Sequence, residues 1–233
     1  MTRAGTARAR VRAELTREIT EIARRQLATE GAAGLSLRAV AREMGMVSSA
    51  IYRYFPSRDD LLTALIIDGY NAVGEAVERA DEQARGRPYG ERWLAVCRAV
   101  REWALAHPHE YALLYGSPVP GYKAPQDTVS AAMRDTVVFA RIVTEAYEAG
   151  ALEPAGPCPP LPDELRADLE RTRGHVRMDV PDEVAARALT AWAGLFGTVS
   201  FELFGQFDNA IDNRAPYFDH AMTLLGRMVG LTI

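Results

Sequence analysis

VSSAIYRYFPSRDDLL, residues 47–62, holds two Tyr, one Phe and two Arg around a single Pro. Pro56 cannot continue a helix that reaches it from the N-terminal side, so a helix before it must be short. Ser48 is the expected N-cap of that short helix. Ser57 and Asp60 can form a capping box, which marks the start of another helix. The stretch therefore predicts a short helix, a break and then a long helix.

The residues before this stretch predict two more helices. The first has a 3.6-residue apolar period and ends near Gly31 and Gly34. Ser36 is the expected N-cap of a second, short helix, which Gly45 closes. Two short helices joined by a turn that contains Gly, with a long helix after them, are typical of the helix-turn-helix plan. The second short helix would then be the one that enters the DNA major groove.

That second short helix has the residue types that a major groove requires. A groove about 12 Å wide admits a helix whose side chains are small where its backbone approaches the bases. Hydroxyl and guanidinium donors beside them can reach the phosphates. The alternative is that the aromatic residues only fill a core; we expect this of Phe55, as of Ile51, whereas buried Tyr hydroxyls would need partners. The DNA contacts predicted on this basis are Ser48, Ser49, Ala50, Tyr52, Arg53, Tyr54 and Arg58.

The charge distribution supports an anionic partner at the N-terminal end. The whole chain has a formal net charge of −4, which alone argues against nucleic acid. Residues 1–60, however, hold 11 Arg and 7 acids, and residues 61–233 hold 16 Lys and Arg and 24 acids. The first part therefore carries +4 and the second −8, an asymmetry expected when one end faces an anion.

The rest of the chain predicts helices only, so the expected fold class is all-α. A turn-rich joint over 84–90 and several Pro-rich breaks separate the helices, and the Pro-rich stretches 116–125 and 153–162 are expected to be surface loops. We expect a helix-turn-helix domain over 1–56 and a helical effector-binding and dimerisation domain over 57–233. The expected helices of the second domain are 57–83, which connects it to the first, 90–107, 108–116, 125–150, 161–173, 181–206 and 214–231.

The stretch LSLRAVAREMGMVSSAIYRYFPSRDDLLTAL, residues 35–65, resembles the DNA-binding head of the TetR/AcrR family of transcriptional regulators. The matching features are Ser36, Ala41 with Gly45, Tyr52 with Phe55, Arg58, and Leu61 with Leu62. The resemblance implies that phosphates are held by Ser36, Tyr52, Tyr54 and Arg58, and that base edges are approached by Arg38, Ser48, Ser49, Ala50 and Arg53. The family often has Lys, Arg or Pro where this chain has Ser49, so the operator cannot be copied from a relative.

Residues 107–125 and 191–207 resemble a TetR-family regulatory domain named for a Trp-His-Gly motif. Trp192 and Gly197 fit that pattern, and Phe196 stands where the His is expected. The resemblance implies an all-helical pocket that senses a small molecule and a two-helix dimer interface, but it names no ligand.

Residue types suggest where that pocket and that interface would lie. The pocket candidates are aromatic or Met side chains, which could equally be plain core: Trp93, Trp103, Tyr111, Tyr115, Met133, Phe139, Trp192 and Phe196. Small residues on 181–206 would let two helices approach closely, and the last helix would complete a four-helix interface. The interface candidates are Ala193, Gly194, Gly197, Ser200, Phe218, Met222, Leu225, Met228 and Val229. The alternative is that helix 181–206 is buried within one chain.

Other classes find little support in the residues. The four His are scattered and supply no metal-ligand set, so we expect no metal and no cofactor. Cys97 and Cys158 are expected to be free thiols, as in a reducing cytoplasm. The N-terminal residues lack the apolar region of a signal peptide, and the apolar run 188–201 is shorter than a membrane span. We expect a cytoplasmic protein with no membrane partner.

These observations predict a homodimeric, ligand-responsive transcriptional regulator, more specifically a repressor that a small, largely apolar effector releases from a palindromic operator. A small-molecule carrier or helical interaction module with a vestigial head is the rival hypothesis, which salt-sensitive duplex binding would exclude. A helical enzyme is a third, supported by nothing beyond the aromatic residues. The operator, the effector and the regulated genes are not readable from the sequence.

Overall fold

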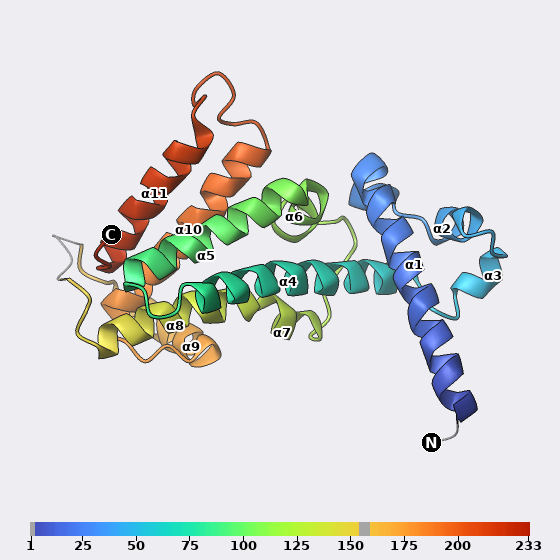
Figure 1. The fold of residues 1–233 in the computed structure, drawn as a ribbon, viewed down its shortest axis with the longest axis horizontal. Coiled ribbons are helices and arrows are strands. Elements are labelled where there is room, and N and C mark those ends of the chain that lie inside the picture. Colours follow the sequence, from blue (N-terminus) through green and yellow to red (C-terminus); the bar gives the residue numbers. More distant parts are fainter. Residues whose placement is uncertain (1–2, 154–158) are drawn as a thin grey trace. The chain divides into compact units, whose positions relative to one another are not determined.

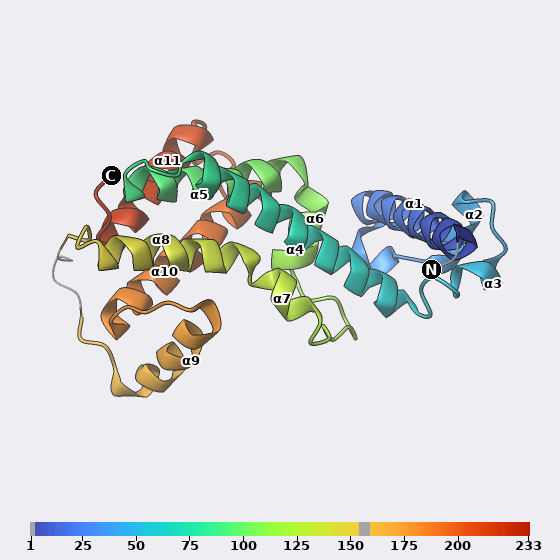
Figure 2. The same ribbon diagram turned by 60° about the horizontal axis from the view of Figure 1, so that its bottom comes forward.

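A computed structural model describes residues 3–153 and 159–233. Within these ranges helices are joined by turns and loops, and the only β-structure is an isolated bridge between Leu152 and Leu231 (Figures 1 and 2). The predicted all-α fold class is therefore confirmed. The helices are α1 (Arg3–Gly34), α2 (Leu37–Glu43), α3 (Ser48–Ile51), α4 (Arg58–Gln83), α5 (Tyr89–Ala106), α6 (Pro108–Tyr115), α7 (Thr128–Ala132), α8 (Arg134–Glu148), the 3₁₀ turn η1 (Asp163–Leu165), α9 (Arg166–Val176), α10 (Asp182–Leu203) and α11 (Arg214–Val229).

The chain divides into two compact units. The first contains the residues up to Gly69 together with His107–Val129, and the second contains Tyr70–Ala106 and Ser130–Ile233. In the first unit α6 packs against α1, so this unit includes more of the chain than the head expected over 1–56. Helix α4 contributes residues to both units.

Local sequence signals explain the helix boundaries of the first unit. The Ala39 N–H donates to the Ser36 hydroxyl at 3.4 Å, which makes Ser36 the predicted N-cap of α2. Gly45 follows α2 with a φ of +67°, a conformation in which a residue without a Cβ is unstrained. The capping box is formed as predicted, because the Ser57 N–H donates to Asp60 Oδ2 at 2.9 Å and the Asp60 N–H donates to Ser57 Oγ at 3.1 Å.

The start of α3 differs from expectation. Ser48 is not the N-cap of α3 but its first residue, because Val47, in extended backbone, occupies the cap position and has no side-chain acceptor. The first helix ends at Gly34, in the region predicted from Gly31 and Gly34, and Gly31 itself forms a kink with φ of 68° and ψ of 176°.

The second unit follows the expected helices with two subdivisions. The helix expected over 125–150 is divided into α7 and α8, with Met133 between them, and the one expected over 161–173 consists of η1 and α9. In the Pro-rich stretch 153–162, residues 154–158, which include Cys158, lie outside the described residues.

The core of the second unit forms around α10. This helix contacts α5, α8, α9 and α11, and it lies beside α11, to which the segment 204–213 joins it (Figure 1). Trp93 on α5 is buried, donates its indole N–H to the Met222 carbonyl at 2.9 Å and meets the Phe139 ring edge-on with centroids 5.3 Å apart. By length and composition α10 could cross a membrane, but its contacts are those of a helix in a bundle.

Two buried groups of the second unit have shifted pKa values. Asp81 is 1% exposed, and although burial disfavours its charge, hydrogen bonds from Arg92 and Arg141 hold its pKa below the ordinary value. Cys97 on α5 is a fully buried free thiol, and burial raises its pKa well above the usual range. The first group belongs to a buried ion-pair cluster in which removal of one partner would leave an uncompensated charge, and the second is an unreactive thiol in the native protein.

Candidate DNA-binding surface and ligand cavity

Helix α3 and the turn after it expose the residues predicted to contact DNA. Ile51 and Phe55 are buried in the head, while Tyr52 is 42% exposed. Among the other predicted contacts, Arg38, Ser48, Ser49 and Arg53 are exposed, and Ser36, Ala50, Tyr54 and Arg58 are half-buried. The small side chains and the donors of this surface are therefore accessible to a duplex, as a recognition helix requires.

Arg12 on α1 holds the C-terminal side of this surface in place. Its Nη2 donates to the Arg53 carbonyl at 2.9 Å, and its guanidinium lies over the Tyr54 ring, 5.3 Å from the centroid. A cation in this position stabilises both the turn after α3 and the orientation of the ring. The sequence reasoning did not single out Arg12; the basic character of residues 1–60 was the only signal that could have indicated it.

The guanidinium of Arg58 is directed into the head. Its Nη2 donates to the Ala32 carbonyl at 2.5 Å, and its Nε donates to the Leu35 carbonyl at 3.2 Å. The last carbonyls of a helix have no partner within the helix, and a guanidinium can satisfy several of them at once. Arg58 thus joins the start of α4 to the end of α1. Its phosphate contact stays a prediction, and it would require the guanidinium to donate to a phosphate as well as to these carbonyls.

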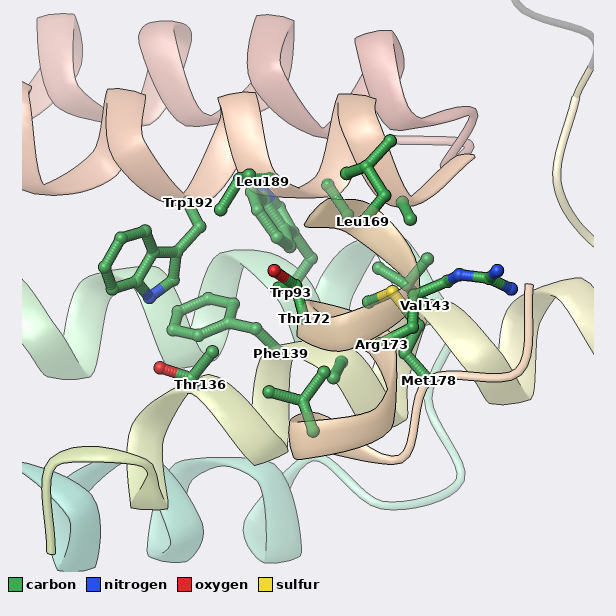
Figure 3. A pocket seen from close by; sticks show the side chains of 14 residues that line it. Trp93, Thr136, Phe139, Val143, Leu169, Thr172, Arg173, Met178, Leu189 and Trp192 are labelled. Atoms are coloured by element: carbon green, nitrogen blue, oxygen red, sulfur yellow. The ribbon is translucent and has the colours of Figure 1, made fainter. Parts of the chain in front are cut away.

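The second unit contains a small cavity that is partly open to solvent, and the space within it that the centre of a water-sized sphere can occupy is about 50 Å³ (Figure 3). Its wall is mainly apolar and comes from α5, α8, α9, the segment after α9 and α10, with three polar side chains, Thr136, Thr172 and Arg173. A mainly apolar lining with a few polar groups is typical of small-molecule sites. The apolar lining residues are Trp93, Phe139, Ala140, Val143, Leu169, Val176, Met178, Ala185, Ala188, Leu189 and Trp192.

The structure brings only three of the predicted pocket residues into this wall, namely Trp93, Phe139 and Trp192. Trp103, Met133 and Phe196 are not part of it, and Tyr111 and Tyr115 belong to the first unit. The reason is that aromatic residues at helical spacing fill cores as readily as pockets. The contribution of α9 was missed, because its sequence is mostly polar and only Leu169 and Val176 give it an apolar side.

One end of the cavity has a polar group behind it. Thr136 and Trp192 form the wall there, and Asp135, next to Thr136 on α8, is 2% exposed. Burial raises the pKa of Asp135 from 3.8 to about 6, against the lowering effect of hydrogen bonds from Thr136. The Trp192 indole N–H also lies close enough to lower this pKa, but the contact does not have the geometry of a hydrogen bond.

Helices α10 and α11 expose large apolar side chains, and only some of the predicted interface residues are exposed with them. Ala193 and Gly197 are exposed, while Phe218, Met222 and Val229 are buried inside the chain. Gly194, Ser200, Leu225 and Met228 are half-buried, and a Cβ at Gly194 would lie 2.9 Å from Leu225 Cδ1, so this glycine serves packing between α10 and α11. The large exposed apolar residues of the two helices and of the α10 C-cap are Leu189, Phe201, Phe204, Tyr217 and Leu224.

Comparisons with known proteins agree with this arrangement. Residues 19–65 match the model of the bacterial regulatory proteins of the tetR family, and residues 93–225 match that of the tetracyclin repressor-like C-terminal domain. The HTH-type transcriptional regulator Rv1816 of Mycobacterium tuberculosis is 42% identical over 197 residues, which cover 84% of this chain and 83% of the relative.

Solved structures give the same result. The regulatory protein SCO4313 is 34% identical with a TM-score of 0.76, and the match covers 93% of this chain and 97% of that one. A Rhodococcus sp. RHA1 protein of unknown function is 30% identical with a TM-score of 0.67, covering 94% and 96% of the two chains.

The exposed recognition helix, the head and the helical second unit define the class: this is a DNA-binding transcriptional regulator of the helix-turn-helix type and not an enzyme. Within that class the chain belongs to the tetR family. The predicted family is thus confirmed. The matched C-terminal model is described only as tetracyclin repressor-like, so the likeness to the Trp-His-Gly type stays a prediction.

Proposed function

We propose that this regulator is a cytoplasmic homodimeric repressor that a small, mainly apolar effector releases from a palindromic operator. The observation that carries the proposal is the apolar cavity between α5, α8, α9 and α10, which lies within the region that matches the tetracyclin repressor-like C-terminal domain. Its mainly apolar lining suits an apolar ligand. The repressor role rests on the family alone.

The exposed apolar surface of α10 and α11 supports the dimer. Phe201 and Leu224 are 51% and 53% exposed, and both belong to helices that pack against each other. Large apolar side chains on adjacent helices are expected to be covered by a second copy in a symmetric interface. A dimer would present two heads, as two half-sites of a palindrome require.

The proposed mechanism is a population shift. An effector changes the equilibrium only through its different affinities for the DNA-binding and the released conformations. Helix α4 is the proposed lever, because it is continuous over Arg58–Gln83 and has residues in both units.

The test begins with selection of bound duplexes from a random library, followed by a salt titration of the selected sequence. We expect a palindrome and a steep salt dependence, because a dimer contacts many phosphates. Compounds that release this duplex would identify effectors, and the position of the sequence relative to a promoter would distinguish repression from activation. Equal retention of random and selected duplexes at low salt would contradict the proposal and favour a binding protein without an operator.

A further inference from the structure

The net positive charge of the first 60 residues comes from one short segment at the start of α1. Residues 1–13 hold four Arg and no acid, whereas residues 14–60 hold seven Arg and seven acids. The charge asymmetry that predicts an anionic partner therefore lies in the N-terminal part of α1 and not around α3. The four arginines are Arg3, Arg8, Arg10 and Arg12.

This part of α1, residues 3–13, is called the arm here, and it extends beyond the packed core of the head. Among the side chains that the structure describes, the first buried one on α1 is Ile19, and residues 7–14 are all exposed. Even Val11, a large apolar residue, is 56% exposed. In Figure 1 this end of α1 continues past α2 and α3. About two turns of helix are therefore accessible to a partner on every side.

Two faces of the arm differ in charge. Arg8 and Arg12 are four residues apart, so they share a face of α1, and the same face leads to the buried Ile19. No acid lies on this face between Arg8 and Ile19. Arg10 lies about 200° round the helix from Arg8, and Glu14 follows it by four residues. The face of Arg8 and Arg12 is thus purely cationic, whereas the face of Arg10 has both signs.

Arg12 connects the cationic face to the predicted DNA contacts. It donates to the Arg53 carbonyl at 2.9 Å and lies over the Tyr54 ring, which uses one of the five N–H donors of its guanidinium. The Arg8 guanidinium, about 6 Å further along the axis, forms no ion pair or hydrogen bond with any residue that the structure describes. Arg25 on the same helix is, in contrast, paired with an acid. Arg8 therefore has its donors available next to the surface predicted to contact DNA.

We propose that the arm of α1 forms a second DNA contact, in which Arg8 and Arg12 donate to backbone phosphates just outside the base pairs that α3 contacts. A helix is about 10 Å across and the minor groove about 6 Å, so the arm meets the backbone and adds affinity without base specificity. A duplex presents phosphates at short intervals along both strands, and a cationic face continuous with the α3 surface can therefore reach them. The inference goes beyond the proposed function, because it needs the DNA binding of the family but neither the effector cavity nor the dimer.

The experiment compares Arg8→Ala with Arg10→Ala in the full chain. Each variant loses one exposed positive charge from the same helix, and Ala favours a helix, so both should stay folded, which a thermal melt checks. Arg12 is left unchanged, because its substitution would also release the Arg53 carbonyl and the Tyr54 ring.

Fluorescence anisotropy gives the affinity for the selected operator at several salt concentrations between about 50 and 200 mM. One duplex has about ten flanking base pairs on each side, and the other is trimmed to the palindrome. On the longer duplex Arg8→Ala should lower the slope of log K against log salt by about 0.9 for each protomer bound, while Arg10→Ala should keep the slope of the parent. On the trimmed duplex, which lacks the flanking phosphates, Arg8→Ala and the parent should have the same slope.

The outcomes separate this inference from the proposed function. Equal losses of slope in the two variants, a parent-like slope in Arg8→Ala, or a loss that persists on the trimmed duplex would each overturn the arm contact. The slopes are also measured on random duplex, because phosphate contacts do not depend on sequence. Failure of the operator selection would contradict the proposed function, while a loss confined to Arg8→Ala on random duplex would still support the arm.

Discussion

At Arg58 the family motif and the structure assign different partners to the same guanidinium. The resemblance predicts a phosphate, whereas the structure directs the donors to the carbonyls of Ala32 and Leu35. Both roles would make the residue important for DNA binding. The two roles differ in what a substitution would change in the absence of DNA: only the contact with the carbonyls contributes to the stability of the free protein.

Arg58→Ala should lower the free energy of unfolding by about 1–3 kcal/mol, because carbonyls at the end of α1 lose their donor. Urea denaturation measures this, and Arg38→Ala, which changes an exposed arginine on α2, should leave the midpoint unchanged. If Arg58 also holds a phosphate, the salt dependence of duplex binding should fall by about one unit of slope. An unchanged stability would contradict the capping role, and an unchanged slope would contradict the phosphate contact.

Asp135 should make stability depend on pH in a direction opposite to that of most carboxylates. Its pKa is about 6 in the folded protein and about 3.9 in an unfolded chain. The folded state therefore binds the proton more tightly, and the stability gained from this is fully present below about pH 4 and is lost as the pH rises through about 6.

Asp135→Asn should consequently raise the free energy of unfolding at pH 8 by up to about 3 kcal/mol, the equivalent of about two pKa units. The difference in the free energy of unfolding between Asp135→Asn and the parent should decrease as the pH falls from 7 to 4. Thermal or urea unfolding at several pH values measures it, with Asp179→Asn, which alters an exposed carboxylate of the same unit, as the control. Parallel stability curves for Asp135→Asn and the parent would show that burial does not perturb this carboxyl.

At the scale of the helix, the capping box of α4 gives a sharp test of how the sequence determines structure. Ser57→Ala and Asp60→Ala each remove one of the two reciprocal hydrogen bonds at the start of α4. We expect each to cost about 1 kcal/mol of stability, with the double variant costing less than the sum, because the two bonds form one unit. Urea denaturation checks this, and strictly additive losses would contradict the coupling.

Local signals predicted the helices well because caps, Gly and Pro act on neighbouring residues. Ser36, Gly45 and the capping box have the roles that the sequence indicated. The cavity was predicted less well because its wall depends on which faces of distant helices meet. Trp93 and Trp192 were identified, whereas α9 was not, since a mostly polar helix with two apolar residues resembles a solvent-exposed one. The buried Asp135 likewise has no sequence signal, because an Asp in a first helical turn is ordinarily exposed.

At the scale of the whole molecule, the exposed residues of α10 and α11 should decide the oligomeric state. Leu224→Glu should convert the proposed dimer to a monomer, because it would bury two uncompensated charges at a symmetric interface. Light scattering after size-exclusion chromatography measures the mass. Leu165→Glu is the matched control, since Leu165 in η1 is 44% exposed and lies outside α10 and α11. A monomeric parent, or a Leu224→Glu protein of unchanged mass, would contradict this interface.

The buried thiol on α5 offers a reporter that needs no operator. Alkylating reagents attack the thiolate, so Cys97 can react only while the helices around it are transiently open. In a Cys158→Ser protein, the rate at which iodoacetamide increases the mass of the sample would report how often Cys97 becomes exposed. Trp93, one turn before Cys97 on the same helix, borders the cavity. A compound that fills the cavity should therefore slow the alkylation of Cys97. The alkylation rate can then serve as the readout in a screen of unlabelled metabolites.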